Sequence, residues 1–77
     1  MIPIGERLRA WRKYRGLTLA DLAESAKIGE ATLSKIERGL QGVRAAQLEA
    51  MTERLSTSMV EFYSRIPDGD EPQAANG

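Results

Sequence analysis

The sequence predicts an all-α protein that folds as one compact domain of five helices. Its 77 residues are enough for a single small core. Apolar residues recur at helical spacing in each periodic segment, and glycine, proline or a capping residue bounds each of these segments. No segment alternates apolar β-branched residues with polar ones, as a half-buried strand would. Helices alone are therefore expected to build the core.

The first helix is expected over residues 4–15, where Ile4, Leu8 and Trp11 share one face. We interpret Trp11 as a core residue, and Gly16 as the residue that ends this helix. The same segment carries five basic side chains: Arg7, Arg9, Arg12, Lys13 and Arg15. The helix face that they form either is solvated or contacts an anionic partner.

Two short helices joined by a tight turn are expected next. Thr18 is placed to cap the first of them, and Asp21 three residues later completes a capping box. Gly29 is a plausible cap for the second, which is expected over about residues 30–38. Gly39 then ends that helix in the left-handed conformation that glycine adopts most easily.

A fourth helix is expected over residues 44–55, from the apolar spacing of Leu48, Met51 and Leu55. A second capping box, Ser58 with Glu61, marks the start of the fifth helix, and Pro67 stops it.

The fifth helix carries more apolar surface than a short terminal helix needs for docking on so small a core. Part of that surface is therefore expected to form a homodimer interface, made by Met59, Val60, Phe62, Tyr63 and Ile66. Residues 67–77 have almost nothing to bury, so we expect a folded domain over residues 1–66 and a disordered acidic C-terminal tail over 67–77.

The stretch GLTLADLAESAKIGEATLSKIERG, residues 16–39, resembles the helix-turn-helix of the Xre family, the phage-repressor and Cro-like DNA-binding proteins. The resemblance covers residues 4–63 and depends on the order of features: a basic first helix, G-L-T at a turn, L-A on the second helix and I-E-R-G closing the third. It implies a lambda-repressor-like domain in a cytoplasmic transcriptional regulator. Such a regulator, most simply a repressor, binds a pseudo-palindromic operator in double-stranded DNA as a dimer.

The resemblance implies that the helix at residues 30–38 enters the major groove. Its first, second and sixth positions read bases in the family, and these are Glu30, Ala31 and Lys35 here. Glu30 can accept from cytosine N4, Ala31 can touch a thymine methyl, and Lys35 can donate to guanine. The residues expected to contact or flank the DNA backbone are Arg12, Thr18, Lys27, Gly29, Thr32, Ser34, Arg38 and Arg44. The plainer alternative is a solvated helix face.

The resemblance also implies an ion pair between Arg12 and Glu37, which would tie the first helix to the third; two unconnected surface charges are the alternative. Lys27 departs from the family pattern, because it stands where the inter-helix turn usually has glycine. A positive φ there would cost about 1 kcal/mol. Leu19 stands where the second helix often has a DNA-binding glutamine, and Val43-Arg44 replaces a Pro-Ser pair.

The formal net charge is zero, but it is unevenly distributed. Residues 1–66 hold all 11 basic residues and 8 of the 11 acidic ones, a net charge of +3, and the tail carries −3. Local charge, and not the total, sets the attraction for DNA.

Composition argues against other classes of protein. The chain has no Cys and no His, so neither a disulfide framework nor a metal or cofactor site is expected, and an enzyme is not expected. No apolar stretch approaches the roughly 20 residues that span a bilayer, and the start does not have the pattern of a secretory signal. Two alternatives remain open: an antitoxin that holds a toxin as protein partner, and a helical interaction module without DNA binding, which Leu19 and Glu30 favour.

Overall fold

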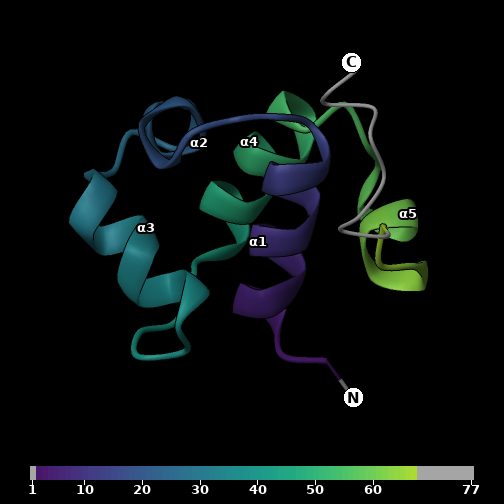
Figure 1. Cartoon of the computed structure of the whole chain (residues 1–77), viewed down its shortest axis with the longest axis horizontal. Coiled ribbons are helices and arrows are strands. Elements are labelled where there is room, and N and C mark those ends of the chain that lie inside the picture. Colours follow the sequence, from purple (N-terminus) through teal and green to yellow (C-terminus); the bar gives the residue numbers. More distant parts are fainter. Residues whose placement is uncertain (1, 68–77) are drawn as a thin grey trace.

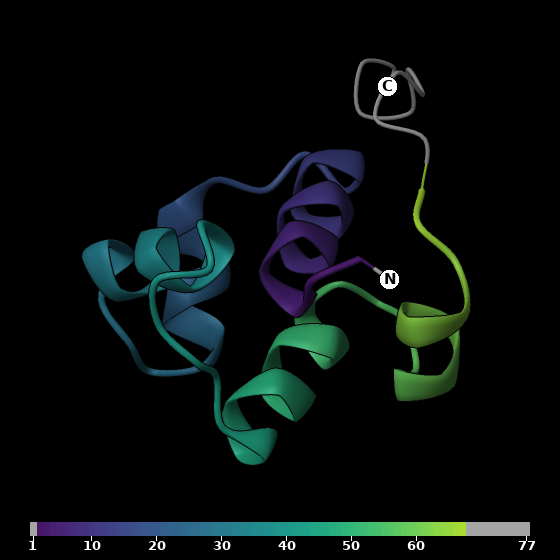
Figure 2. The same cartoon turned by 90° about the horizontal axis from the view of Figure 1, so that it is seen from below.

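The computed structural model describes residues 2–67, and over these residues the chain is helical with no strand. The five helices are α1 (Ile4–Tyr14), α2 (Leu19–Ser25), α3 (Glu30–Glu37), α4 (Ala45–Arg54) and α5 (Met59–Ser64). Helix α1 lies between the α2–α3 pair on one side and α5 on the other, and α4 packs against both α2 and α5 (Figures 1 and 2). The expected all-α, five-helix fold is confirmed.

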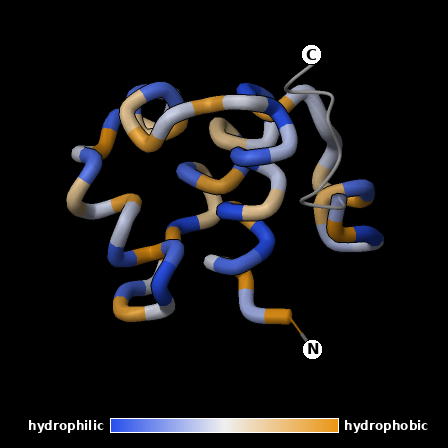
Figure 3. Tube along the Cα trace, in the orientation of Figure 1, coloured by the Kyte–Doolittle hydropathy of each residue, from blue (hydrophilic) through white to orange (hydrophobic). Residues whose placement is uncertain are grey.

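The core draws on every helix. Figure 3 shows hydrophobic and hydrophilic residues in the helices, and every helix contributes at least one apolar residue to the buried cluster. The buried cluster consists of Leu8, Trp11, Leu22, Ala23, Leu33, Ile36, Leu48, Met51, Leu55 and Phe62. Trp11 is fully buried, as its interpretation as a core residue requires. None of the described helices has the length and apolar character needed to cross a membrane.

Helices α1 to α4 end in the same way. The residue after the C-cap has a positive φ, and the N–H groups of this residue and the next one donate to carbonyls in the last turn of the helix. At the end of α3, for example, the N–H groups of Gly39 and Leu40 donate to the carbonyls of Ile36 and Lys35. The residues of positive φ are Gly16 (71°), Lys27 (58°), Gly39 (79°) and Ser56 (57°). The strained conformation expected at Lys27 is therefore present, and Ser56 shares it.

Helix α2 begins with the expected reciprocal capping box. The Thr18 hydroxyl accepts from the Asp21 N–H at 3.0 Å, and the Asp21 carboxylate accepts from the Thr18 N–H at 3.0 Å. These bonds, the one from the Thr18 backbone above all, lower the pKa of the Asp21 carboxyl below its usual value.

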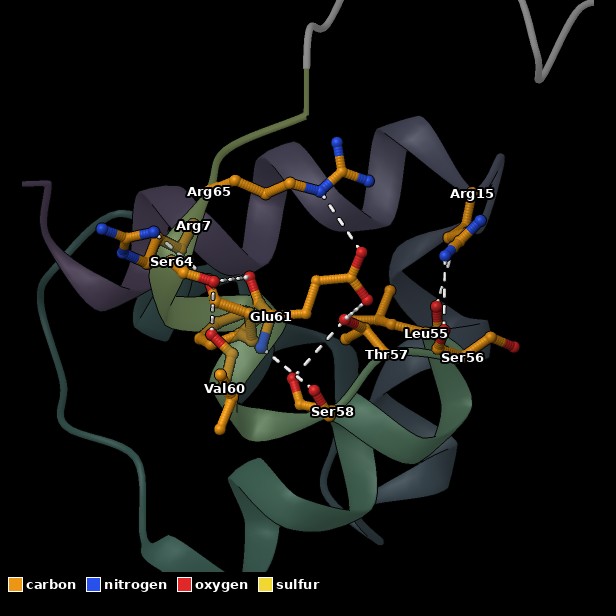
Figure 4. Close-up of polar contacts among 11 residues, drawn as sticks. Arg7, Arg15, Leu55, Ser56, Thr57, Ser58, Val60, Glu61, Ser64 and Arg65 are labelled. Carbon is orange, nitrogen blue, oxygen red and sulfur yellow. Dashed lines mark hydrogen bonds and ion pairs between the residues drawn. The ribbon is translucent and has the colours of Figure 1, made fainter.

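The second expected capping box is only half formed. The Ser58 hydroxyl accepts from the Glu61 N–H at 3.0 Å, but the Glu61 carboxylate turns to other donors (Figure 4). It accepts from the Thr57 hydroxyl at 2.8 Å and pairs with Arg65 at 3.3 Å. The Thr57 bond is the main reason why the pKa of Glu61 is lowered.

Several helix ends differ from the sequence prediction. Helices α1, α3 and α4 end at Tyr14, Glu37 and Arg54, and the residue expected last in each is its C-cap. Helix α4 begins at Ala45, because Arg44 is its N-cap and donates its N–H to the Gln47 side chain. Helix α5 ends at Ser64, because Arg65 is already extended. Pro67, which we assigned to the tail, is buried against the domain. The rest of the expected tail, residues 68–77, lies outside the described residues.

Arginines of α1 tie the first helix to the last part of the described chain. Arg7 donates to the Phe62 carbonyl at 3.1 Å, and Arg15 donates to the Leu55 carbonyl at 2.7 Å; Figure 4 shows the Arg15 contact. The guanidinium groups of Arg15 and Arg65 both lie over the Trp11 ring, at 5.5 and 5.1 Å from its centre. These contacts join α1 to the segment from Leu55 to Arg65 and so hold the first and last helices together.

Candidate nucleic-acid interface

Helix α3 presents a short exposed face at the side of the bundle (Figure 1). Its buried residues are Leu33, Ile36 and Glu37, which hold it against α1 and α2. Ala31 and Lys35 lie on the opposite side and are exposed, and Glu30 is exposed at the first position of the helix. The three predicted base-reading residues are thus all accessible to a partner, and they offer an acceptor, a methyl group and a cationic donor.

The predicted Arg12–Glu37 contact is present and fixes α3 on α1. The guanidinium Nε donates to one Glu37 carboxylate oxygen at 2.7 Å and Nη2 donates to the other at 3.0 Å. The Nη1 group of Arg12 donates to the Leu17 carbonyl at 3.0 Å. The two side chains are only 12% and 5% exposed. A bidentate pair that is so well buried sets both the position and the orientation of α3.

These contacts change what Arg12 can offer to DNA. Its three nitrogen atoms each already donate one hydrogen bond within the protein. Arg12 is therefore foremost a positioning residue for α3, and its remaining N–H groups have little exposed surface.

The other predicted flanking residues differ in how exposed they are. Thr18, Lys27, Gly29, Arg38 and Arg44 are exposed, while Thr32 and Ser34 are half-buried. Two of them are helix N-caps: Gly29 for α3 and Thr18 for α2. The Arg38 side chain folds back along α3, with Nε donating to the Ser34 carbonyl at 3.3 Å.

Two residues near this surface received no role from the sequence. Leu40 is 67% exposed directly after α3, although an apolar residue at this position of a helix end usually packs inward. Gly5 of α1 lies against the last carbonyls of α3. The signal for Leu40 was its place after a helix-ending glycine; the signal for Gly5 was a glycine inside a helix, which usually has a packing reason.

The predicted dimer surface is smaller than the sequence suggested. Val60 and Tyr63 are 78% and 48% exposed, and Met59 and Ile66 are half-buried. Phe62 was wrongly assigned to this surface. It is fully buried, because the inner side of α5 needs a large side chain to fill the space against α1 and α4.

The described residues contain no group of three or more acidic, Cys or His side chains arranged to hold a metal ion.

Comparison with known proteins identifies the type of domain. A helix-turn-helix domain family matches residues 3–62. The transcriptional regulator SinR of Bacillus licheniformis is 40% identical over 71 residues, which are 91% of this chain and 61% of that protein. The chain thus spans less than two thirds of that relative's length.

Solved structures show the same arrangement of helices. The clp gene regulator ClgR of Corynebacterium glutamicum superposes with a TM-score of 0.75 at 28% identity, over 96% of this chain and 70% of that one. The wild-type restriction-modification controller protein C.Esp1396I gives 0.71 at 26% identity, over 79% and 78% of the two chains. The chain therefore belongs to the Xre-type helix-turn-helix family of DNA-binding transcriptional regulators, a family of regulators and not of enzymes.

Proposed function

We propose that this domain reads a specific site in double-stranded DNA with α3 in the major groove, and that the protein represses transcription there as a homodimer. One observation carries the proposal: Ala31 and Lys35 on the outer side of α3, and Glu30 at its start, are exposed, while the inner side of the helix is held against α1 by a buried ion pair. A rigid helix that carries groups able to distinguish base pairs is what direct readout requires.

Each residue of the face has a role in this proposal. Lys35 donates to guanine, Glu30 accepts from cytosine, and Ala31 contacts a thymine methyl. Lys27, Arg38 and Arg44 hold phosphates on either side, which fixes the register of α3 but carries no sequence information. The relatives come from bacteria, whose DNA lies in the cytoplasm, and this supports the proposal that the protein acts there.

The first experiment selects binding sites from a library of random-sequence duplexes and compares two variants on the enriched duplex. Lys35→Ala should relax the preference at one position of the site, at a cost of about 1–3 kcal/mol for the preferred base. Arg44→Ala should weaken the enriched and the random duplex alike. If Lys35→Ala also weakened both alike, Lys35 would not be a base-reading residue.

The second experiment measures affinity against salt concentration. Each phosphate that the protein neutralises adds about 0.9 to the log–log slope, so a dimer with two or three contacts per subunit gives about −4 to −5. A slope near zero would favour the alternative of an interaction module without DNA binding. Co-purification of a second protein from the native host would favour the antitoxin alternative.

A further inference from the structure

A groove of about 550 Å³ runs along α1 beside the end of α3. One wall is formed by Pro3 and one face of α1. The other wall is formed by Glu37, which is the last residue of α3, by its C-cap Arg38 and by Gly39. The groove is lined by Pro3, Glu6, Arg9, Ala10, Lys13, Glu37, Arg38 and Gly39. Its small residues, Ala10 and Gly39, let a partner approach the two backbones closely.

The charge of the groove favours an anionic partner. Arg9, Lys13 and Arg38 are all exposed along it. Of its two carboxylates, that of Glu37 is already neutralised by Arg12. Glu6 forms no ion pair among the described residues and is the only carboxylate left to oppose the three cations.

The groove is continuous with the reading face of α3. Arg38 belongs to both, since it lines the groove and folds back over Ser34 on α3. The eight residues of α3 span about 12 Å, which matches the width of the major groove, also about 12 Å. With α3 lying across the major groove, its C-terminal end meets the phosphate backbone at the groove's edge. This continuity favours DNA over an acidic peptide.

We propose that this groove carries the phosphodiester backbone that borders the site read by α3. Arg9, Lys13 and Arg38 bind successive phosphates, and they extend the contact with DNA along α1. The inference rests on the proposed function and adds to it a second, sequence-independent contact surface. It also assigns a role to Arg9 and Lys13 on the basic face of α1, for which the sequence analysis left open whether it is solvated or contacts an anionic partner.

The test uses the enriched duplex and a random duplex as probes. The double variant Arg9→Ala/Lys13→Ala should weaken binding to both by the same factor. It should also reduce the magnitude of the salt slope by about 0.9 for each lost contact in each subunit. The control is Arg54→Ala, which removes an exposed cation of α4 that does not line the groove. Its slope should match that of the wild type. Unchanged thermal melting would show that all variants remain folded.

A gain of affinity provides an independent readout. Glu6→Gln removes the opposing carboxylate and should tighten binding to both duplexes by about threefold per bound subunit at low salt. A misfolded variant could not produce this result.

The outcomes separate the two proposals. If the wild type bound neither duplex, both the proposal that the groove binds the DNA backbone and the proposed function would be overturned. If the wild type bound DNA but the double variant had the same salt slope as the wild type, only the proposal about the groove would be overturned. An acidic protein segment would then become the candidate occupant of the groove.

Discussion

At the scale of single residues, the Arg12–Glu37 ion pair does more for the fold than any surface pair. Glu37→Ala would leave a guanidinium that is only 12% exposed without its carboxylate. Removing one partner of a buried pair costs about 3 kcal/mol or more. Urea unfolding should show this loss, and DNA binding should weaken because α3 is no longer held. Glu53→Ala, at an exposed glutamate of α4, should change stability by less than about 0.5 kcal/mol. Equal stability of the two variants would mean that the pair contributes nothing.

Gly5 matters for a different reason, because it lets α1 approach α3. A Cβ at this position would overlap the Ile36 carbonyl oxygen and lie 2.9 Å from that of Glu37. Gly5→Ala should therefore destabilise the domain by about 1–3 kcal/mol, even though alanine is the better helix former. The thermal midpoint is the measurement.

Gly42→Ala is the matched control for this substitution. A Cβ at Gly42 meets nothing within 4 Å, and the residue is not among those of positive φ. Its stability should stay the same or rise slightly, since alanine restricts the unfolded chain. A loss at Gly42 as large as that at Gly5 would argue against the close helix contact as the cause.

At the scale of the elements, two helix ends carry side chains where glycine fits best. Lys27 and Ser56 have φ values of 58° and 57° at the ends of α2 and α4. Lys27→Gly and Ser56→Gly should each stabilise the domain by about 1 kcal/mol in denaturant unfolding.

The two glycine variants should differ in DNA binding. Lys27 is a proposed phosphate contact, so Lys27→Gly should lower affinity and reduce the salt slope by about 0.9 per subunit. Ser56 lies at the far end of α4, and its variant should bind as the wild type does. Loss of affinity in both variants would mean that the effect comes from the fold and not from the lysine.

The sequence predicted those parts of the elements that depend on nearby residues. The Thr18–Asp21 box and the ends at Gly16 and Gly39 involve groups a few residues apart, which leave a local pattern. Contacts between distant residues leave none. Only the packed structure shows that Phe62 faces α1. The Glu61 carboxylate is a different case, because Thr57 and Arg65 are local partners that compete with the capping box. The Arg12–Glu37 pair spans 25 positions and was predicted only through the family resemblance.

The same division applies to the candidate site. The exposed side of α3 followed from helical periodicity, since burying Leu33 and Ile36 turns Lys35 outward. The groove along α1 could not be predicted in this way, because it depends on how the end of α3 lies beside that helix.

At the scale of the whole molecule, the exposed apolar residues of α5 bear on assembly. We expect Val60→Asp/Tyr63→Asp to give a folded monomer with much weaker operator binding, because two-fold contact through this surface would bury the new charges. Sedimentation equilibrium and circular dichroism would measure both properties. The control Val60→Ile/Tyr63→Phe keeps the surface apolar and should keep the dimer. A wild type that sediments as a monomer at tens of micromolar, with tight binding to a single half-site, would contradict the assignment.

The contact between the first and the last helix, α1 and α5, has a consequence for synthesis in the cell. Of the five described helices, α1 leaves the ribosome before the others and α5, one of the helices that covers it, leaves after them; the Arg7–Phe62 hydrogen bond joins positions 55 residues apart. Until residue 62 has emerged, the nascent chain cannot bury the part of α1 that α5 will cover. Domains fold as units, so translation has to run almost to the end of residues 1–67 before α3 is held in its reading position. A message truncated before α5 would yield a chain with an incomplete core, which lacks Phe62.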